Sequence, residues 1–251
     1  MSWRIAIDLM GGDNAPGETI SGAMEALERY DVALHLVGTR EALEGVPAEM
    51  RGRVELTEAD SVVNMHDPAV AVMKEKAGSS MAKAVGLVRD GAADAVVSAG
   101  NTGALFTAAS LMLRRVKGVR RAALSTILPL SKPFIMLDVG ANIDSTPEVL
   151  ALYGRMGSMY ASDVLGIENP RVALLNNGGE AEKGTAVYTG AYALLQADPS
   201  IRFIGNCEGR DIPFDFCDVL VCDGFTGNIA LKLVEGMGRF MNDSIKGLFT
   251  K

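Results

Sequence analysis

The chain has 251 residues, of which 48% are hydrophobic and 22% are charged. This length and composition can bury a large core, and one α/β domain is the default expectation. Lysine and arginine number 24 and aspartate and glutamate 31, so the formal charge is −7, which argues against duplex nucleic acid as a partner.

In the first half of the chain, short apolar runs alternate with segments of helical spacing. The apolar runs predict strands at Trp3–Asp8, Val32–Val37, Val54–Leu56 and Ala95–Val97. The helical spacings predict helices over Glu18–Tyr30 and Ser79–Arg89, and another that follows Ala95–Val97 and runs to Leu113. Between them, Val62–Lys76 is mixed in character, with Pro68 at an expected helix start.

The second half continues the alternation. Strands are predicted at Ala122–Leu128, Phe134–Val139, Arg171–Leu175, Phe203–Ile204 and Val219–Cys222. Helices are predicted at Pro147–Ala161, at Thr185–Gln196, and in an amphipathic run over Ile229–Phe249. This pattern predicts an α/β protein of three αβα layers, whose largely parallel sheet is covered on both faces. No linker divides the chain, so residues 1–251 are expected to form a single α/β catalytic domain.

The turn after the strand at Ala95–Val97 is typical of an anion site. It reads SAGNTG over residues 98–103 and leads directly into a predicted helix. Such a turn leaves backbone N–H groups pointing outward at the positive end of a helix dipole, which suits phosphate. Polar loops also follow the other strands, and in parallel sheets ligands sit beyond the carboxyl ends of the strands. We therefore expect the site where these loops converge.

The sequence offers few protein nucleophiles. It contains no G-x-S-x-G elbow, no Walker A loop and no G-x-G-x-x-G dinucleotide fingerprint. His35 and His66 lack an evident partner and are interpreted as structural. Cys217 and Cys222 are interpreted as core residues, whereas Cys207 is placed in a polar loop and is the one thiol worth testing as a nucleophile. Three cysteines without metal-ligand spacing fit a reduced cytosol.

Many donors and no evident nucleophile favour a reaction in which the substrate supplies its own nucleophile, as inorganic phosphate does. If the electrophile is a thioester, the leaving thiolate needs little acid assistance, since thiols have a pKa of about 8.5. Lys183 is either the cation for such an anion or a solvated lysine paired with Glu180 and Glu182. The acids that end strands either cap neighbouring helices or contact substrate; they are Asp8, Asp138 and Asp223.

Six long motifs resemble one family in order. They are AIDLMGGDNAPG at Ala6–Gly17, VSAGNTGAL at Val97–Leu105, LDVGAN at Leu137–Asn142, LLNNGGEAEKG at Leu174–Gly184, IGNCEGRDIP at Ile204–Pro213 and VCDGFTGNIALK at Val221–Lys232. On these residues the chain resembles the PlsX family, the acyl-carrier-protein:phosphate acyltransferases of bacterial phospholipid synthesis. The resemblance implies a fold like those of isopropylmalate dehydrogenases and phosphotransacetylases. It also implies further elements after the last motif, because family members continue beyond it.

The resemblance implies transfer of a long-chain fatty acyl group from acyl carrier protein to inorganic phosphate, without a metal or another cofactor. It implies Lys183, Asn228 and Asn101 as catalytic residues. The residues implied for substrate or phosphate binding are Asp8, Gly12, Asn14, Ser98, Thr102, Gly103, Asp138, Asn142, Asn176, Glu180, Asp223 and Thr226. It further implies a cytoplasmic homodimer with no nucleic-acid partner.

Two charged or amphipathic segments have two interpretations each. Ile229–Phe249 is either a core or dimer-interface helix, or it makes peripheral contact with an anionic membrane. The basic cluster Arg114–Arg121 is either a solvated face or a contact for the acidic carrier protein.

Three alternative functions remain open from the sequence. The first is a short-chain phosphotransacetylase that uses coenzyme A, which a long apolar acyl channel would argue against. The second is a non-catalytic module that binds acyl carrier protein or phosphate. The third, an NAD-dependent dehydrogenase on the related fold, is disfavoured by the missing dinucleotide fingerprint.

Overall fold

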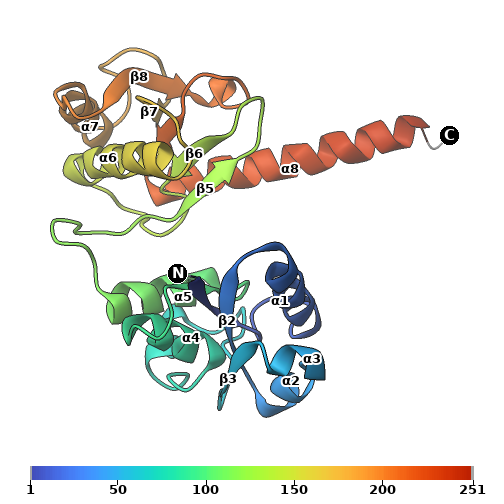
Figure 1. The fold of residues 1–251 in the computed structure, drawn as a ribbon. Helices are drawn as coiled ribbons and strands as arrows, with labels where there is room; N and C mark the ends of the chain where they lie inside the picture. Colours follow the sequence, from blue (N-terminus) through green and yellow to red (C-terminus); the bar gives the residue numbers. More distant parts are fainter. Residues whose placement is uncertain (1, 250–251) are drawn as a thin grey trace. The chain divides into compact units, whose positions relative to one another are not determined.

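Two separate β-sheets organise the chain in a computed structural model that describes residues 2–249, with the side chain of Phe249 left aside (Figure 1). Each sheet belongs to its own unit: unit 1 comprises residues 1–116 and unit 2 residues 117–251. The expectation that residues 1–251 form a single catalytic domain stays a prediction.

Unit 1 contains a four-stranded sheet in the order β3-β2-β1-β4, in which every pairing is parallel. Its strands are β1 (Trp3–Asp8), β2 (Val32–Gly38), β3 (Val54–Glu58) and β4 (Ala95–Val97). Its α-helices are α1 (Gly17–Arg29), α2 (Arg40–Glu44), α3 (Ala48–Arg51), α4 (Ser80–Arg89) and α5 (Thr102–Ala108). A 3₁₀ helix, η1 (Ala69–Met73), starts after Pro68, and a π-helical turn, η2 (Ala109–Leu113), continues α5.

Helices cover both faces of the unit 1 sheet. Successive side chains of a strand point to opposite faces, and β2 illustrates the consequence. Leu34 and Leu36 pack with residues of α1 and of the α2–α3 region. Val37 points the other way and packs with Ala84 of α4. Strands buried on both faces give the continuous apolar runs seen in the sequence.

Unit 2 contains a five-stranded sheet in the order β5-β6-β9-β7-β8. Its strands are β5 (Ser125–Leu128), β6 (Phe134–Leu137), β7 (Arg171–Asn176), β8 (Arg202–Glu208) and β9 (Val219–Val221). Its helices are α6 (Pro147–Asp163), α7 (Ala186–Gln196), the short η3 (Gly209–Asp211) and α8 (Gly224–Phe249). All pairings are parallel except that of β5 with β6.

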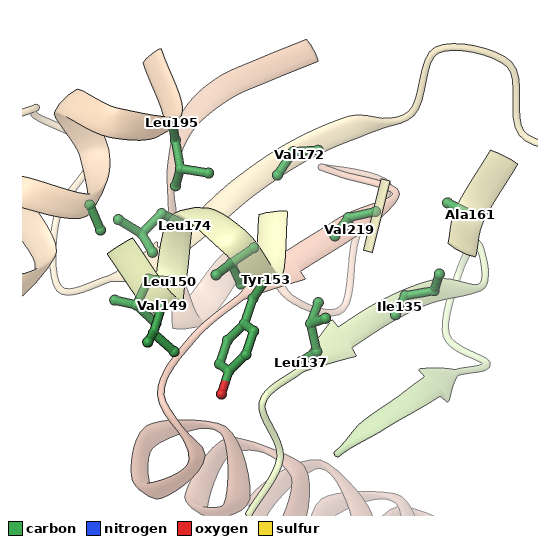
Figure 2. Packing of buried hydrophobic residues seen from close by; sticks show 12 residues of the cluster. Ile135, Leu137, Val149, Leu150, Tyr153, Ala161, Val172, Leu174, Leu195 and Val219 are labelled. Atoms are coloured by element: carbon green, nitrogen blue, oxygen red, sulfur yellow. The ribbon is translucent and has the colours of Figure 1, made fainter. Parts of the chain in front are cut away.

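The core of unit 2 is also divided by its sheet. On one face, Leu137 and Val219 pack with α6 and α7 around the fully buried Tyr153. Figure 2 shows Tyr153 among these aliphatic side chains, with its hydroxyl at the edge of the group. On the other face, Met136 and Leu220 pack with the early turns of α8. The later turns of α8 extend past the sheet of unit 2 and are exposed (Figure 1).

The α/β class and the mostly parallel pairing are confirmed, and most predicted elements lie within a few residues of the observed ones. Several details of the prediction are wrong. There are two sheets rather than one, and β5 is antiparallel because residues 129–133 are too short for a parallel crossover. The helix predicted from Ile229 begins at Gly224, so the segment expected as a loop forms its first turns. Cys207 lies fully buried in β8 rather than in a polar loop.

We expect Gly157→Ala to destabilise the protein. A Cβ at this buried position in α6 would clash with Val219 Cγ1 and would lie 3.0 Å from Leu137 Cδ2. Overpacking of this kind costs about 1–3 kcal/mol, which chemical denaturation measures. The control is Met159→Ala on the exposed side of the same helix, where we expect a change within about 0.5 kcal/mol. Equal effects of the two substitutions would contradict the close packing of α6.

We expect Asp218→Asn to lower stability in a pH-dependent way. Burial acts to raise the pKa of Asp218, but hydrogen bonds from Arg171 and Lys132 outweigh it and hold the pKa below its ordinary value. The carboxylate therefore stabilises the fold fully above the unfolded-state pKa of about 3.9, and this contribution is lost as pH falls further. At neutral pH the loss should be about 3 kcal/mol.

Urea denaturation of wild type and Asp218→Asn at neutral pH and between pH 4 and 2 measures this effect. The difference between them should shrink as the solution becomes more acidic. The exposed Asp243→Asn serves as control. A difference that stays constant with pH would show that Asp218 does not carry the predicted charge.

Candidate functional site

In unit 1, the predicted residues gather where β1 and β4 end. The buried carboxylate of Asp8 accepts hydrogen bonds from Ser98 Oγ at 2.7 Å and from Met10 N at 3.2 Å. Ser98 Oγ in turn accepts from Gly100 N at 3.2 Å. A Cβ at Gly11 would lie 2.7 Å from both Gly100 N and Ser98 Oγ, so only glycine allows the two loops to approach. The Asp8–Ser98 pair therefore organises this edge.

Both polar atoms of the Asn101 side chain form hydrogen bonds with nearby backbone groups. Its Oδ1 accepts from Ala104 N at 3.0 Å and so caps α5. Its Nδ2 donates to three carbonyl oxygens of the preceding loop, those of Asn64, Met65 and Asp67. Asn14, Thr102 and Gly103 are exposed, and Gly12 has φ +112° and is half-buried. The arrangement makes Asn101 a positioning residue for the turn.

In unit 2, the loop after β6 folds around the fully buried carboxylate of Asp138. Its two oxygens accept from Leu124 N, Gly140 N, Ala141 N, Asn142 N and Asn142 Nδ2, at 2.8–3.2 Å. Asn142 also donates to Ala122 O at 2.7 Å and to the Tyr153 hydroxyl at 3.0 Å. Asp138 and Asn142 therefore shape the loop.

The start of α8 is held by a second acid. Asp223 Oδ1 accepts from Thr226 N at 2.8 Å, which caps the helix, and Oδ2 accepts from Thr226 Oγ1 at 3.1 Å. Tyr188 of α7 donates its hydroxyl to Asp223 Oδ2 at 2.5 Å. Burial, and then the hydrogen bond to Asp223, raise the pKa of Tyr188 above its ordinary value. The phenol therefore stays protonated and serves as a donor.

The first turns of α8 pack against the loop after β6. Gly224 N donates to Asn142 O at 2.8 Å. A Cβ at Gly227 would clash with Asp138 O, and one at Gly140 would lie 2.9 Å from Asn228 Nδ2. These contacts place Asp138, Asn142 and Asn228 side by side, as the convergence of strand-end loops predicts.

The loop after β7 presents Lys183. Asn176 Nδ2 donates to Lys183 O at 3.0 Å, and Asn176 Oδ1 accepts from Asn177 N at 2.9 Å. Asn206 of β8 donates its Nδ2 to Glu180 O at 2.7 Å and so holds the same loop. The loop is thus ordered by amides rather than by ion pairs.

Lys183 is exposed, and its ammonium forms no ion pair with any carboxylate in the described part of the chain. The alternative of a lysine paired with Glu180 or Glu182 is therefore wrong. Its aliphatic stem lies over Gly178, where a Cβ would be 2.7 Å from Lys183 Cγ. A cation without a partner at a loop of amide donors is suited to an anion.

A groove of about 1020 Å³, which we call the α8 groove, lies within unit 2. Polar groups line one end: Asn176, Asn177, Thr185, Tyr188 and Thr226. Apolar side chains line the rest, among them Leu130, Ile212, Ile229, Leu233, Met237 and Met241. The groove thus joins predicted site residues from β7 and α8 to a long apolar surface.

Sequence reasoning found most strand-end residues but missed Tyr188 and Thr185. Both lie at the start of α7, which the pattern predicted correctly, and Tyr188 was counted only as part of that helix. A tyrosine in the first turn after a polar loop is the signal that could have found it. The predicted unit 1 residues form their own cluster, and their joint action with unit 2 stays a prediction.

No group of three or more histidine, cysteine, aspartate or glutamate side chains among residues 2–249 is arranged to hold a metal ion. None of the helices described is long and apolar enough to cross a membrane.

The chain is similar to proteins of known family. The family model for "Fatty acid synthesis protein" matches residues 3–251. The phosphate acyltransferase of Heliobacterium modesticaldum is 46% identical over 248 residues, which cover 97% of this chain and 74% of that protein. The phosphate acyltransferase of Synechocystis sp. is 44% identical over 249 residues, which cover 97% of this chain and 71% of that protein.

Solved structures share the fold at low identity. The EutD phosphotransacetylase from Staphylococcus aureus matches with a TM-score of 0.66 and 16% identity, over 94% of this chain and 82% of that one. A branched-chain phosphotransacylase from Enterococcus faecalis matches with a TM-score of 0.64 and 16% identity, over 94% and 85% of the two chains. These matches confirm the predicted fold class. With nearly the whole chain matched by the family model and by relatives above 40% identity, the chain belongs to the fatty acid synthesis protein family of phosphate acyltransferases.

Proposed function

We propose that this chain transfers a long-chain acyl group from the thioester of acyl carrier protein to inorganic phosphate, for use in phospholipid synthesis. A phosphate oxygen attacks the thioester carbonyl carbon, and a tetrahedral oxyanion forms. Its collapse breaks the C–S bond and releases acyl phosphate and the carrier-protein thiolate. The proton that hydrogen phosphate loses on acylation passes to this thiolate through water. Because thiols have a pKa of about 8.5, the leaving group needs no strong acid.

The observation that carries the proposal is the pairing of an unpartnered cation with an apolar groove. Asn176 and Asn177 line the polar end of the α8 groove, and Asn176 Nδ2 donates to the backbone carbonyl of Lys183, the residue before the groove-lining Gly184. The Lys183 ammonium is suited to a phosphate dianion, and the apolar surface of the α8 groove is suited to an acyl chain. The family membership independently supports acyl transfer to phosphate.

The thiols of the chain support direct attack by phosphate. Cys207, Cys217 and Cys222 are all buried, and burial raises the pKa of the Cys222 thiol well above its ordinary value. A buried neutral thiol is a poor nucleophile. The proposal therefore assigns the protein the tasks of positioning phosphate and stabilising the oxyanion.

Individual roles follow from the contacts. Lys183 binds the phosphate dianion, and Asn228, beside the loop of Asp138, offers an amide donor to the oxyanion. Asp138 positions the loop after β6 and Asp223 positions the start of α8. Their carboxylates accept hydrogen bonds from backbone N–H groups and, for Asp223, also from the Tyr188 hydroxyl. Asn101 positions the unit 1 turn that carries Ser98, Thr102 and Gly103.

A short-chain phosphotransacetylase is the second candidate function. Of the solved structures named above, one is a phosphotransacetylase and the other a branched-chain phosphotransacylase, but at 16% identity they establish the fold alone. The α8 groove favours the long-chain reaction, because an acetyl group would leave most of its apolar surface exposed.

The partners in this proposal are acyl carrier protein, phosphate and a second copy of the chain, in the cytoplasm. Contact with an anionic membrane is proposed for the later turns of α8. There Phe240, Ile245 and Leu248 are exposed, while Arg239 and Lys246 lie on the opposite side of the helix.

Lys183→Ala should lower kcat/KM for phosphate about 10–100-fold, since a hydrogen bond to a charged group is worth about 1.5–3 kcal/mol. The assay follows phosphate-dependent release of free carrier protein from palmitoyl-acyl carrier protein. Lys232→Ala, which removes an exposed lysine paired with Glu235, is the matched control and should retain wild-type activity. Full activity of Lys183→Ala would remove this residue from the catalytic set.

A further inference from the structure

The apolar wall of the α8 groove is a continuous stripe of one helix. Ile229, Leu233, Met237 and Met241 follow one another at intervals of four residues and line the groove together. Residues at this spacing share one face of a helix. The opposite wall comes from the body of unit 2, including Leu175 and Ile212. An elongated apolar ligand would therefore lie along the helix.

The polar end defines the other half of the ligand. Thr226 begins the stripe, and Asn176 and Tyr188 face the same space. A ligand that fills the groove must combine a polar, reactive head with a long apolar tail. We propose that the α8 groove binds the acyl chain of the substrate, with its carbonyl end near Thr226 and its tail directed toward Gly238 and Met241. This inference rests on the proposed acyl transfer for the identity of the head group.

The length of the groove matches a long acyl chain. Twelve residues separate Thr226 from Gly238, which corresponds to about 18 Å along a helix. An extended hydrocarbon chain advances roughly 1.3 Å per bond, because C–C bonds near 1.5 Å run in a zigzag. A palmitoyl chain is then about 19 Å long and reaches Gly238, whereas a lauroyl chain, about 14 Å long, ends before it.

Gly238 provides a precise place to shorten the groove. It lines the groove, and a Cβ built there meets no other atom within 4 Å. A leucine side chain at this position would therefore occupy the space of the chain's end without a clash inside the protein. Replacing an exposed helical glycine also improves helix propensity, so Gly238→Leu should fold.

Gly236 supplies a matched control on the same helix. A Cβ at Gly236 also meets nothing within 4 Å, but Gly236 does not line the groove. Two residues along a helix turn the side chain by about 200°. Gly236→Leu therefore adds the same apolar side chain and the same helix propensity on another side of α8.

The experiment titrates wild type, Gly238→Leu and Gly236→Leu with palmitate and laurate by calorimetry. In parallel, phosphate-dependent turnover is measured with palmitoyl- and lauroyl-acyl carrier protein. Gly238→Leu should weaken palmitate binding about tenfold or more, because the end of the chain is displaced into water. It should leave laurate binding within about twofold, and Gly236→Leu should leave both unchanged.

The outcomes separate this inference from the proposed function. Equal palmitate binding by the three proteins, or no palmitate binding by wild type, overturns the groove assignment even if turnover is normal. Selective loss of palmitate binding without any phosphate-dependent turnover upholds the groove and overturns the proposed reaction. If Gly238→Leu instead changes only the oligomeric state or the binding to phosphatidylglycerol vesicles, the groove serves a second copy or a lipid surface, and the inference is wrong.

Discussion

The buried carboxylate of Asp138 is the constraint on which the unit 2 site depends. A carboxylate without solvent is costly unless hydrogen bonds satisfy it, and here the backbone N–H groups of residues 140–142 and of Leu124 do so. Meeting that requirement wraps the loop around the acid. The wrapped loop presents Asn142 O to Gly224 N, where α8 begins. The position of the helix therefore follows from one buried charge.

The start of α8 serves two purposes through one geometry. Its first turn is tied to Asp223 and Tyr188 and carries Thr226 and Asn228 at the sheet edge. Its next turns pack on the sheet through Ala230, Leu231 and Val234. The polar site and the apolar groove thus lie next to each other, because α8 carries polar residues in its first turn and the apolar residues of the groove in the turns that follow. This continuity suits a substrate whose reactive carbonyl is attached to a long hydrocarbon chain.

The sequence allowed much of the fold to be predicted because buried parallel strands leave continuous apolar runs, such as Val172–Leu175. It did not reveal α2 and α3, which have five and four residues and are too short for a helical period to appear. The start of α8 was missed because Gly224 and Gly227 are typical of turns. Gly227 is required instead by the close approach of Asp138 O.

The site was predicted as a list of strand-end residues, and the structure separates their tasks. The sequence left Asp138 and Asp223 open between helix capping and substrate contact, and the resemblance implied Asn101 as catalytic. In the structure, side-chain oxygens of all three accept hydrogen bonds from backbone N–H groups of the protein itself. Only three-dimensional contacts reveal such engagement. Lys183 shows the reverse case, since its acidic neighbours in sequence suggested ion pairs that are not formed. The α8 groove is lined by four separate segments of the chain, at Leu130, Leu175–Tyr188, Gly209–Pro213 and Thr226–Met241, so no local sequence pattern predicts it.

In the proposed reaction, phosphate attacks the thioester directly and no acylated form of the protein occurs. The measurement that tests it most directly is mass spectrometry of the intact chain after incubation with palmitoyl-acyl carrier protein, first without phosphate and then with it. We expect an unmodified chain in both samples and acyl phosphate only in the second. A palmitoyl adduct on the chain that forms without phosphate and disappears when phosphate is added would contradict it.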